Sequence, residues 1–277
     1  MVTDFPRIGE GPVMLRVENL AVVYPNGTAA LQPTGLAFER GAFTVLLGAS
    51  GAGKSTLLRS LNHLVRPTAG RILVDGLGDI STPGSLRTHR RATGMIFQQH
   101  QLIGRLSVLE NVLIGRLGFH SPLRTLLPFP GQEKHDALDA IERVGLIEYA
   151  LRRADQLSGG QQQRVGIARA LVQKPRLILA DEPVASLDPA TAERVLGLLH
   201  SICKADAIAA IVSLHQLDFA RRYADHIVGL ARGEVVFDGP PARLGKKEVA
   251  LIYGDVPPAA VEDTGDSEIH LKTGTYA

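Results

Sequence analysis

Short apolar runs alternate with longer amphipathic segments along most of the chain. Three runs rich in Val, Ile and Leu lie at residues 43–48, 176–181 and 209–215. Because nearly every position in them is apolar, we predict strands that are buried on both faces of a mostly parallel sheet. Residues 15–24 and 70–76 alternate apolar and polar positions more strictly, and we predict that they form an antiparallel edge of the same fold.

The period of the apolar positions changes in the middle of the chain. From about Ser107 to Val172 apolar residues recur every three or four positions, which predicts helices. The predicted helices are 107–117, 134–146 and 161–173, with Pro122, Pro128, Pro130 and Gly131 between the first two. We therefore predict a helical subdomain, at about residues 100–172, inserted into an α/β core.

The two ends of the chain depart from this pattern. Residues 226–239 form two apolar runs around Gly233 and predict a hairpin. Residues 1–13 contain no apolar run, so they are interpreted as a short N-terminal extension and not as a signal peptide. After Gly245 the chain becomes polar and carries Gly and Pro, which predicts a loose tail, or a late addition to the core, over residues 246–277. The main domain is then expected to span residues 14–245.

Composition narrows the class of protein. An apolar fraction of 45% over 277 residues is enough for a substantial core. The single cysteine, Cys203, has no partner for an internal disulfide, so we expect a buried thiol and a reducing compartment. No stretch approaches the ~20 apolar residues that a membrane helix needs, which predicts a soluble protein able to dock onto a membrane protein. The net charge is only +2, and the sequence lacks the dense basic patch of a nucleic-acid binder.

The strand at 43–48 leads directly into a glycine-rich loop, GASGAGKST. It matches the P-loop pattern, in which backbone N–H groups and the following helix N-terminus hold phosphate oxygens. In such a loop Lys54 binds the β- and γ-phosphates, and the Ser55 hydroxyl ligates Mg²⁺. The predicted nucleotide-binding residues here are Gly48, Ala49, Ser50, Gly51, Ala52, Gly53, Lys54, Ser55 and Thr56.

A second stretch, LILADEP, supplies acidic groups at the end of another apolar strand. Asp181 is placed to hold Mg²⁺, and Glu182 follows where a general base can polarise water at the γ-phosphate. An acid pair at a strand end is weak evidence alone, since acids at strand ends also serve solubility. Together with the P-loop, the pair predicts a nucleotide-hydrolysing site.

Four further positions are ambiguous when each is taken singly. Ser158, in LSGGQQQRVGIARAL, either opens an anion-binding helix N-terminus or is an ordinary helix cap. His215 is equally compatible with a core histidine, Gln98 with a surface glutamine (with Gln99 beside it), and Tyr24 with an edge-strand aromatic. Each ordinary structural role is the better explanation in isolation.

The order of these motifs resembles the ATPase subunit of ABC transporters over roughly residues 14–239, with no motif missing. The resemblance rests on Tyr24, Gly48–Thr56, Gln98, Leu157–Gln161, Leu179–Glu182, Ser186–Asp188 and His215. It implies an α/β fold, a P-loop NTPase (RecA-like) core with an antiparallel β subdomain and an inserted α-helical subdomain. It also implies an enzyme that hydrolyses ATP with Mg²⁺.

The resemblance implies a role for each matching residue within one subunit. Tyr24 is expected to stack on adenine, which needs a flat aromatic face. Gln98 is expected to sense Mg²⁺ and the attacking water and to link the core to the helical subdomain, so that Ser55, Gln98 and Asp181 are the metal-binding residues. His215 is expected to contact the γ-phosphate and to hold the catalytic geometry with Glu182.

Other matching residues imply a homodimer. The signature segment is expected to close over the γ-phosphate of an ATP held by the partner subunit, and the D-loop to cross to that subunit. The signature segment is Leu157, Ser158, Gly159, Gly160 and Gln161, and the D-loop is Ser186, Leu187 and Asp188. A single subunit is therefore expected to hydrolyse ATP much more slowly than the dimer.

A finer resemblance points to the ATP-binding subunit of bacterial phosphonate importers. It rests on YPNGTAAL, NHLVRPTAG, RLSVLENVLIGRLG, ADEPVASLDP and VSLHQLDFARRYADHIVGLARGEVVFDGP. It implies uptake of phosphonates or phosphite-like oxyanions through a membrane permease, with a periplasmic solute-binding protein, and a peripheral position on the cytoplasmic face of the inner membrane. The proline-rich stretch PLRTLLPFPGQEKHD and the C-terminal tail depart from this resemblance.

Three alternatives stay open. The same nucleotide site serves other ABC importers, for example of amino acids or phosphate, and it serves exporters or lipoprotein-release systems. A DNA-maintenance or translation ATPase with the same head is more remote, because such proteins carry a long coiled coil or two heads. Between Gln98 and Leu157 there are no sustained heptads, and the chain has one P-loop, so we expect no nucleic-acid partner.

Overall fold

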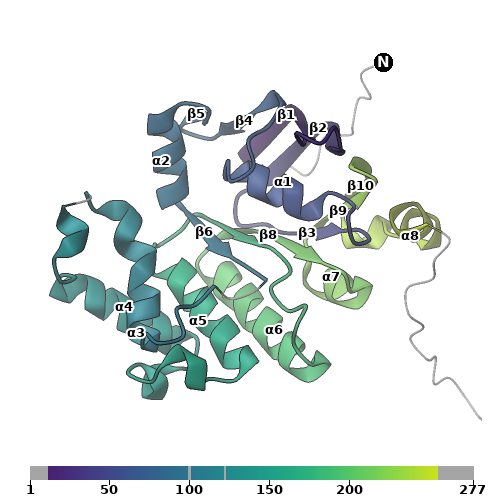
Figure 1. Cartoon of the computed structure of the whole chain (residues 1–277). Helices are drawn as coiled ribbons and strands as arrows, with labels where there is room; N and C mark the ends of the chain where they lie inside the picture. The colour runs from purple at the N-terminus through teal and green to yellow at the C-terminus, as the bar shows by residue number, and fades with distance from the viewer. Residues whose placement is uncertain (1–11, 99–100, 122, 255–277) are drawn as a thin grey trace, which may run out of the picture.

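The computed structural model describes residues 12–98, 101–121 and 123–254, and its strands form two sheets (Figure 1). The smaller sheet is antiparallel, with strand order β2-β1-β4-β5. The larger sheet has strand order β10-β9-β3-β8-β7-β6; its strands from β9 to β6 run parallel, and β10 is antiparallel to β9. The strands are β1 (Val13–Val23), β2 (Ala29–Glu39), β3 (Phe43–Leu47), β4 (Ala69–Val74), β5 (Gly78–Asp79), β6 (Thr93–Ile96), β7 (Leu177–Ala180), β8 (Ala209–Leu214), β9 (His226–Ala231) and β10 (Glu234–Gly239).

The helices divide between the two faces of the larger sheet (Figure 1). They are α1 (Lys54–Leu61), α2 (Pro83–Arg91), α3 (Val108–Leu113), α4 (Gly131–Arg143), α5 (Gly159–Leu171), α6 (Pro189–Ala205), α7 (Leu217–Tyr223) and α8 (Lys246–Tyr253). Short 3₁₀ helices are η1 (Ile114–Phe119), η2 (Arg124–Leu126), η3 (Ile147–Tyr149), η4 (Ala154–Gln156) and η5 (Pro241–Arg243). None of the helices in these described ranges is long and apolar enough to cross a membrane.

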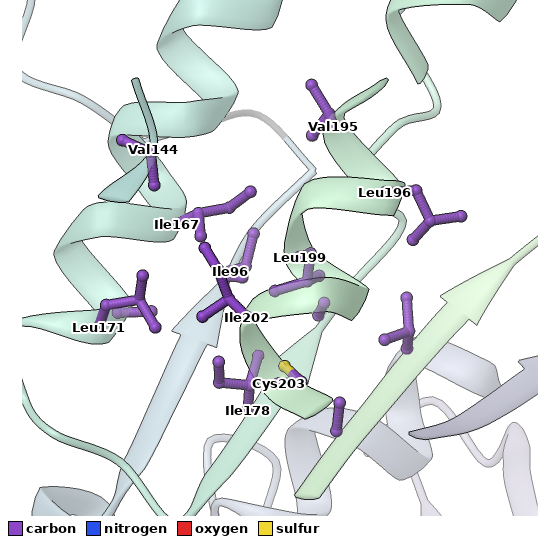
Figure 2. Close-up of a cluster of buried hydrophobic side chains, with 14 of the residues drawn as sticks. Ile96, Val144, Ile167, Leu171, Ile178, Val195, Leu196, Leu199, Ile202 and Cys203 are labelled. Carbon is purple, nitrogen blue, oxygen red and sulfur yellow. The ribbon is translucent and has the colours of Figure 1, made fainter. Parts of the chain in front are cut away.

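The parallel sheet is buried on both faces, as its continuous apolar runs predict. Along β3, Val45 and Leu47 join one hydrophobic cluster, while Leu46 between them joins the other. The first cluster fills the space between the sheet and helices α3–α6; in it Ile96, Ile178, Ile167 and Leu199 gather with Cys203 (Figure 2). The second lies under α1 and the antiparallel sheet. The expected burial of Cys203 is confirmed, and burial raises the pKa of its thiol to about 12.

The antiparallel strands form a sheet of their own, which is the antiparallel β subdomain that the resemblance implies. It includes β2, a strand that the sequence pattern did not predict, which pairs with β1. The hairpin at residues 226–239 is confirmed as β9 and β10, and Gly233 lies in its turn with a φ of 82°.

The inserted helices α3, α4 and α5 pack on one another, and α5 also packs on the edge strand β6. Gly94 of β6 makes this contact close, because a Cβ there would lie 2.9 Å from the Cβ of Ala170. Gly115, which follows α3, has the same effect: a Cβ there would lie 2.4 Å from the carbonyl oxygen of Arg169. Small residues thus fix how the helical insertion rests on the core.

Helix α8 occupies the start of the segment that the sequence predicts to be a loose tail or a late addition to the core. Helix α8 packs on β9 and β10 and buries Ile252, which is 2% exposed. Val249, Ile252 and Tyr253 have the three- and four-residue spacing of one helix face, and all three contact the core. The polar composition that predicts a tail begins only after this helix. Residues 1–11 and 255–277, the rest of the predicted extension and tail, lie outside the described residues.

Candidate active site

The glycine-rich loop joins the end of β3 to the start of α1. Gly53 precedes the first residue of α1 with a φ of 103°, and a Cβ there would lie 2.7 Å from the carbonyl oxygen of Ala30. Both the backbone angle and the close approach require glycine. Gly51 is also left-handed, with a φ of 78°. These glycines turn the chain so that the positive end of the α1 dipole faces the loop, which favours an anion there.

Lys54 is a buried cation at the centre of this loop. Its side chain is 3% exposed, and its Nζ donates to the carbonyl oxygens of Gly48, at 2.8 Å, and Ala49, at 3.1 Å. The same Nζ lies 3.9 Å from Oε1 of Glu182. Burial lowers the pKa of Lys54, while the carboxylates of Glu182 and Asp181 act in the opposite direction. The loop thus holds a concentrated positive charge that a phosphate can approach.

Asp181 follows β7 and is 2% exposed, yet both of its carboxylate oxygens have partners. Its Oδ1 accepts hydrogen bonds from the hydroxyls of Ser55, at 2.7 Å, and Ser213, at 3.2 Å. Its Oδ2 accepts from Nε of Arg59, at 3.2 Å, and from Nη2 of Arg59, at 3.0 Å. A buried carboxylate needs such compensation, and here a guanidinium and two hydroxyls provide it.

Glu182 and His215 face each other across two neighbouring strand ends. Nε2 of His215 lies 2.5 Å from Oε1 of Glu182, and its Nδ1 lies 3.4 Å from Nζ of Lys54. Glu182 has a left-handed backbone with a φ of 47°, and its N–H donates to the Ser213 hydroxyl at 2.8 Å. A non-glycine residue held in this strained region is typical of functional sites.

Two sequence-predicted residues flank this centre. The Tyr24 hydroxyl lies 3.1 Å from Oγ1 of Thr56, so this half-exposed ring stands beside the end of the loop. Gln98 lies two residues beyond β6 and is exposed. Within the described part of the chain no hydrogen bond joins its side chain to another residue. The structure therefore brings Tyr24 to the loop and does not link Gln98 to Asp181. Gln99 lies outside the described residues.

The signature segment forms the N-terminal end of α5, away from the P-loop. The Ser158 hydroxyl accepts from the Gln161 N–H at 3.3 Å, and the Gln161 side chain accepts from the Ser158 N–H at 2.9 Å, which is a capping box. Leu157 before it is buried. A surface pocket of about 590 Å³ opens beside Ser158 and Gln161, lined also by Arg164 and Arg194. Among the described residues no hydrogen bond or ion pair links this segment to the P-loop.

The D-loop lies against the signature segment. A Cβ at Gly159 would lie 3.5 Å from Cδ2 of Leu187, and a Cβ at Gly160 would lie 2.4 Å from Cγ2 of Thr191. Asp188, which follows Ser186 and Leu187, caps α6 by accepting from the Thr191 N–H at 3.0 Å. The N-terminal ends of α5 and α6 therefore present both segments side by side.

Three residues that contact this centre escaped the sequence prediction. Arg59 is four residues after Ser55, a spacing that places both on one face of α1. Ser213 lies in β8, two residues before His215, which directly follows that strand. Both contacts could therefore have been predicted from their spacing to Ser55 and His215, once those two residues were identified as site residues. Tyr253, whose hydroxyl donates to the His215 carbonyl at 3.1 Å, has no comparable signal, because it comes from a distant helix.

Comparisons with known proteins agree with this geometry. The family described as "ABC transporter" matches residues 31–185, which is more than half of the chain. The chain is 62% identical over 240 residues, 87% of each chain, to the phosphite import ATP-binding protein of Stutzerimonas stutzeri. It is 57% identical over 243 residues, 88% of this chain and 93% of the relative, to a phosphonates import ATP-binding protein of Nostoc sp..

Solved structures of ABC transporter ATPase subunits also resemble this chain. One is the dimeric ATP-binding cassette MJ0796 in a post-hydrolysis state bound to ADP and Pi, with a TM-score of 0.71 and 34% identity, covering 82% of this chain and 99% of that one. Another is cbiO1 from Clostridium perfringens, part of an ABC transporter complex, with a TM-score of 0.74 and 32% identity, covering 86% of this chain and 93% of that one. The chain therefore belongs to the ABC transporter family, as one of its ATP-hydrolysing subunits.

Proposed function

We propose that this chain drives an importer of phosphonates or phosphite. Two copies bind ATP between them and act on a membrane permease from the cytoplasmic face of the inner membrane, and a periplasmic binding protein delivers the solute. The choice of solute rests on the sequence identity of 62% and 57% to ATP-binding proteins of phosphite and phosphonate import, over 87% and 88% of this chain.

In this proposal the P-loop binds the phosphates of ATP. Lys54 exchanges its contacts with the Gly48 and Ala49 carbonyls for phosphate oxygens, which are stronger acceptors because they are charged. The α1 N-terminus contributes its dipole and its N–H groups to the same anion. Tyr24 offers its ring to adenine while Thr56 holds its hydroxyl.

Hydrolysis then depends on Glu182 and His215. The attacking water forms a bond to the γ-phosphorus as the bond to the β-γ bridging oxygen breaks, and Glu182 accepts the proton that the water loses. His215, 2.5 Å from the Glu182 carboxylate, orients that base and contacts the γ-phosphate. The Lys54 charge offsets the negative charge that develops on the phosphate oxygens.

The donor groups present fit Mg²⁺. Asp181 and Ser55 present hard oxygen donors 2.7 Å apart, beside the loop that holds the phosphates. No cluster of three His, Cys, Asp or Glu side chains suited to a metal occurs in the described ranges. Asp181 and Ser55, with Gln98 as the resemblance implies, would hold a Mg²⁺ here together with ATP and water. When bound, Mg²⁺ neutralises charge on the β- and γ-phosphates.

The signature segment and the D-loop serve the partner subunit in this proposal. Ser158, Gly159 and Gly160 form a capped helix N-terminus that suits a phosphate, while the P-loop of the same chain lies elsewhere. Arg164 and Arg194, in the adjoining pocket, add positive charge. Each ATP is therefore expected to be held by Lys54 of one subunit and Ser158 of the other.

Reconstitution tests the solute. The chain and its permease are placed in lipid vesicles, and ATP hydrolysis is measured with the binding protein loaded with phosphite, methylphosphonate, phosphate or an amino acid. We expect phosphite or methylphosphonate to stimulate hydrolysis, and phosphate and amino acids to leave it at the basal rate. Stimulation by an amino acid alone would assign the chain to another importer. Co-purification with ribosomes or DNA, without a permease, would refute the transport function.

A further inference from the structure

Helix α8 reaches the catalytic centre from outside the ATPase motifs. Its last residue, Tyr253, donates its hydroxyl to the backbone carbonyl of His215 at 3.1 Å. The two residues are 38 positions apart, and residues 31–185, which match the family, exclude both. The contact therefore joins α8, the last helix of the described range, to the loop that carries His215, the partner of Glu182.

The position of Tyr253 is fixed by its neighbours on α8. Ile252 is 2% exposed and packs against Gly229 of β9, where a Cβ would lie 2.5 Å from its Cδ1 atom. At the other end of the helix, the Gly245 N–H donates to Glu248 at 3.0 Å and caps the first turn. Helix α8 is therefore held on the sheet by contacts that do not involve the Tyr253 hydroxyl. This packing directs the hydroxyl at the His215 carbonyl.

The contact acts on the part of His215 that sets its side-chain position. His215 lies between the buried end of β8 and the start of α7, and its imidazole contacts both Glu182 and Lys54. A hydrogen bond to its carbonyl restrains the peptide that follows its Cα, and with it the direction of the Cα–Cβ bond from which the imidazole extends. A catalytic group has to be held to within a fraction of an ångström for full effect.

The Tyr253 hydroxyl remains a donor throughout the working range of pH. Burial raises the pKa of Tyr253 to about 12, so the hydroxyl keeps its proton at neutral and alkaline pH. The end of α8 also lies near the P-loop, because Tyr253 and Leu251 line a pocket of about 480 Å³ together with Ser50 and Gly51.

We propose that Tyr253 is a positioning residue for hydrolysis, which holds His215 against Glu182 through its backbone carbonyl. Tyr253 does not touch the nucleotide in this proposal and acts through His215. The inference rests on the catalytic roles proposed for Glu182 and His215. It adds that α8 contributes to catalysis, so that a change in the packing of α8 on the sheet changes the rate of ATP hydrolysis.

The test is Tyr253→Phe in the full chain, which keeps the ring and removes the hydroxyl. Loss of one such hydrogen bond is expected to lower kcat for ATP about three- to tenfold, with KM and the melting temperature nearly unchanged. Tyr223→Phe is the matched control: the Tyr223 hydroxyl faces Gly197 of α6, where a Cβ would lie 3.2 Å away, and its removal is expected to leave kcat unchanged.

A double-mutant cycle separates positioning from general stabilisation. In a His215→Ala background, measured by single-turnover hydrolysis, Tyr253→Phe is expected to have no further effect, because its target is gone. An equal loss in both backgrounds, or an unchanged kcat in the wild-type background, would overturn the inference. If instead Glu182→Gln and His215→Ala both hydrolyse ATP at the wild-type rate, the catalytic roles proposed for these two residues fail, and the role of Tyr253 fails with them.

Discussion

Nε2 of His215 lies 2.5 Å from Oε1 of Glu182, and the two residues extend neighbouring parallel strands, β8 and β7. The sheet therefore sets their separation before any nucleotide binds. Ser213 strengthens this arrangement, because its hydroxyl accepts from the Glu182 N–H and donates to the Asp181 carboxylate. One buried serine thus connects the proposed base to the proposed metal ligand.

Replacement of Glu182 by glutamine keeps the shape of this centre and removes the proton acceptor. We expect Glu182→Gln to lower kcat by about 10²- to 10⁴-fold, the usual contribution of a general base. ATP binding, measured with a fluorescent nucleotide, is expected to persist, and an ATP-bound dimer is expected to accumulate. Glu193→Gln on α6, where the native acid pairs with Arg222 at the surface, is the control and is expected to retain full activity. Hydrolysis at the normal rate by Glu182→Gln would exclude this role.

The two glycines of the signature segment are expected to differ in their tolerance of alanine. A Cβ at Gly160 would lie 2.4 Å from Cγ2 of Thr191, whereas a Cβ at Gly159 would lie 3.5 Å from Leu187, an ordinary contact. Gly160→Ala is therefore expected to destabilise the fold by about 1–3 kcal/mol, and Gly159→Ala by much less. Thermal melting of the two variants measures the difference. Thr191→Ser is expected to restore part of the loss, since it removes the clashing methyl group; equal stability of the two glycine variants would contradict this packing.

Stability is expected to fall in mild acid because of His89. This histidine is 2% exposed, its Nε2 lies 2.9 Å from the Leu61 carbonyl, and burial lowers its pKa from 6.5 to about 4. Between these two pH values the unfolded chain binds a proton that the folded chain does not, so the free energy of unfolding decreases as pH falls from 6.5 towards 4. The full loss is on the order of 3 kcal/mol.

Urea unfolding at pH 7 and pH 5 measures this effect. His89→Gln is expected to flatten the pH dependence, because glutamine can donate to the same carbonyl and does not titrate in this range. His135→Gln, at an exposed position of α4, serves as the control and is expected to keep the wild-type slope. A slope unchanged by His89→Gln would assign the acid sensitivity to other groups.

Most of the parallel core could be predicted from the sequence, since burial on both faces leaves uninterrupted apolar runs such as those of β3, β7 and β8. Strand β2 was missed because Pro33 and Gly35 interrupt its pattern. Strand β6 was missed because it spans four residues, too few to show a period. Residues 246–253, which form α8, were predicted to belong to the tail. Their apolar face is short, and the residues that follow are polar, so the segment as a whole showed no clear helical pattern.

The part of the candidate site that lies in short continuous sequence motifs could be predicted. Lys54, Ser55, Asp181 and Glu182 each follow a strand in a recognisable stretch, and the structure brings them together. The contact from Tyr253 could not be predicted, because it depends on where α8 lies in three dimensions. The N-cap role of Ser158 was one of the two alternatives that the sequence left open, and the structure shows this cap. The separation of Ser158 from the P-loop in one chain agrees with the proposed sharing of ATP between two chains.

Mixed dimers test that sharing most directly. One subunit carries Lys54→Ala and the other Ser158→Arg, both with Glu182→Gln to prevent hydrolysis, and retained radiolabelled ATP is counted per dimer. A mixed dimer has one complete site, formed by the intact P-loop of one subunit and the intact signature segment of the other. We predict one retained ATP per mixed dimer and none in either parent homodimer. Equal retention by the Ser158→Arg homodimer, or none in the mixed dimer, would contradict a nucleotide held between two copies of this chain.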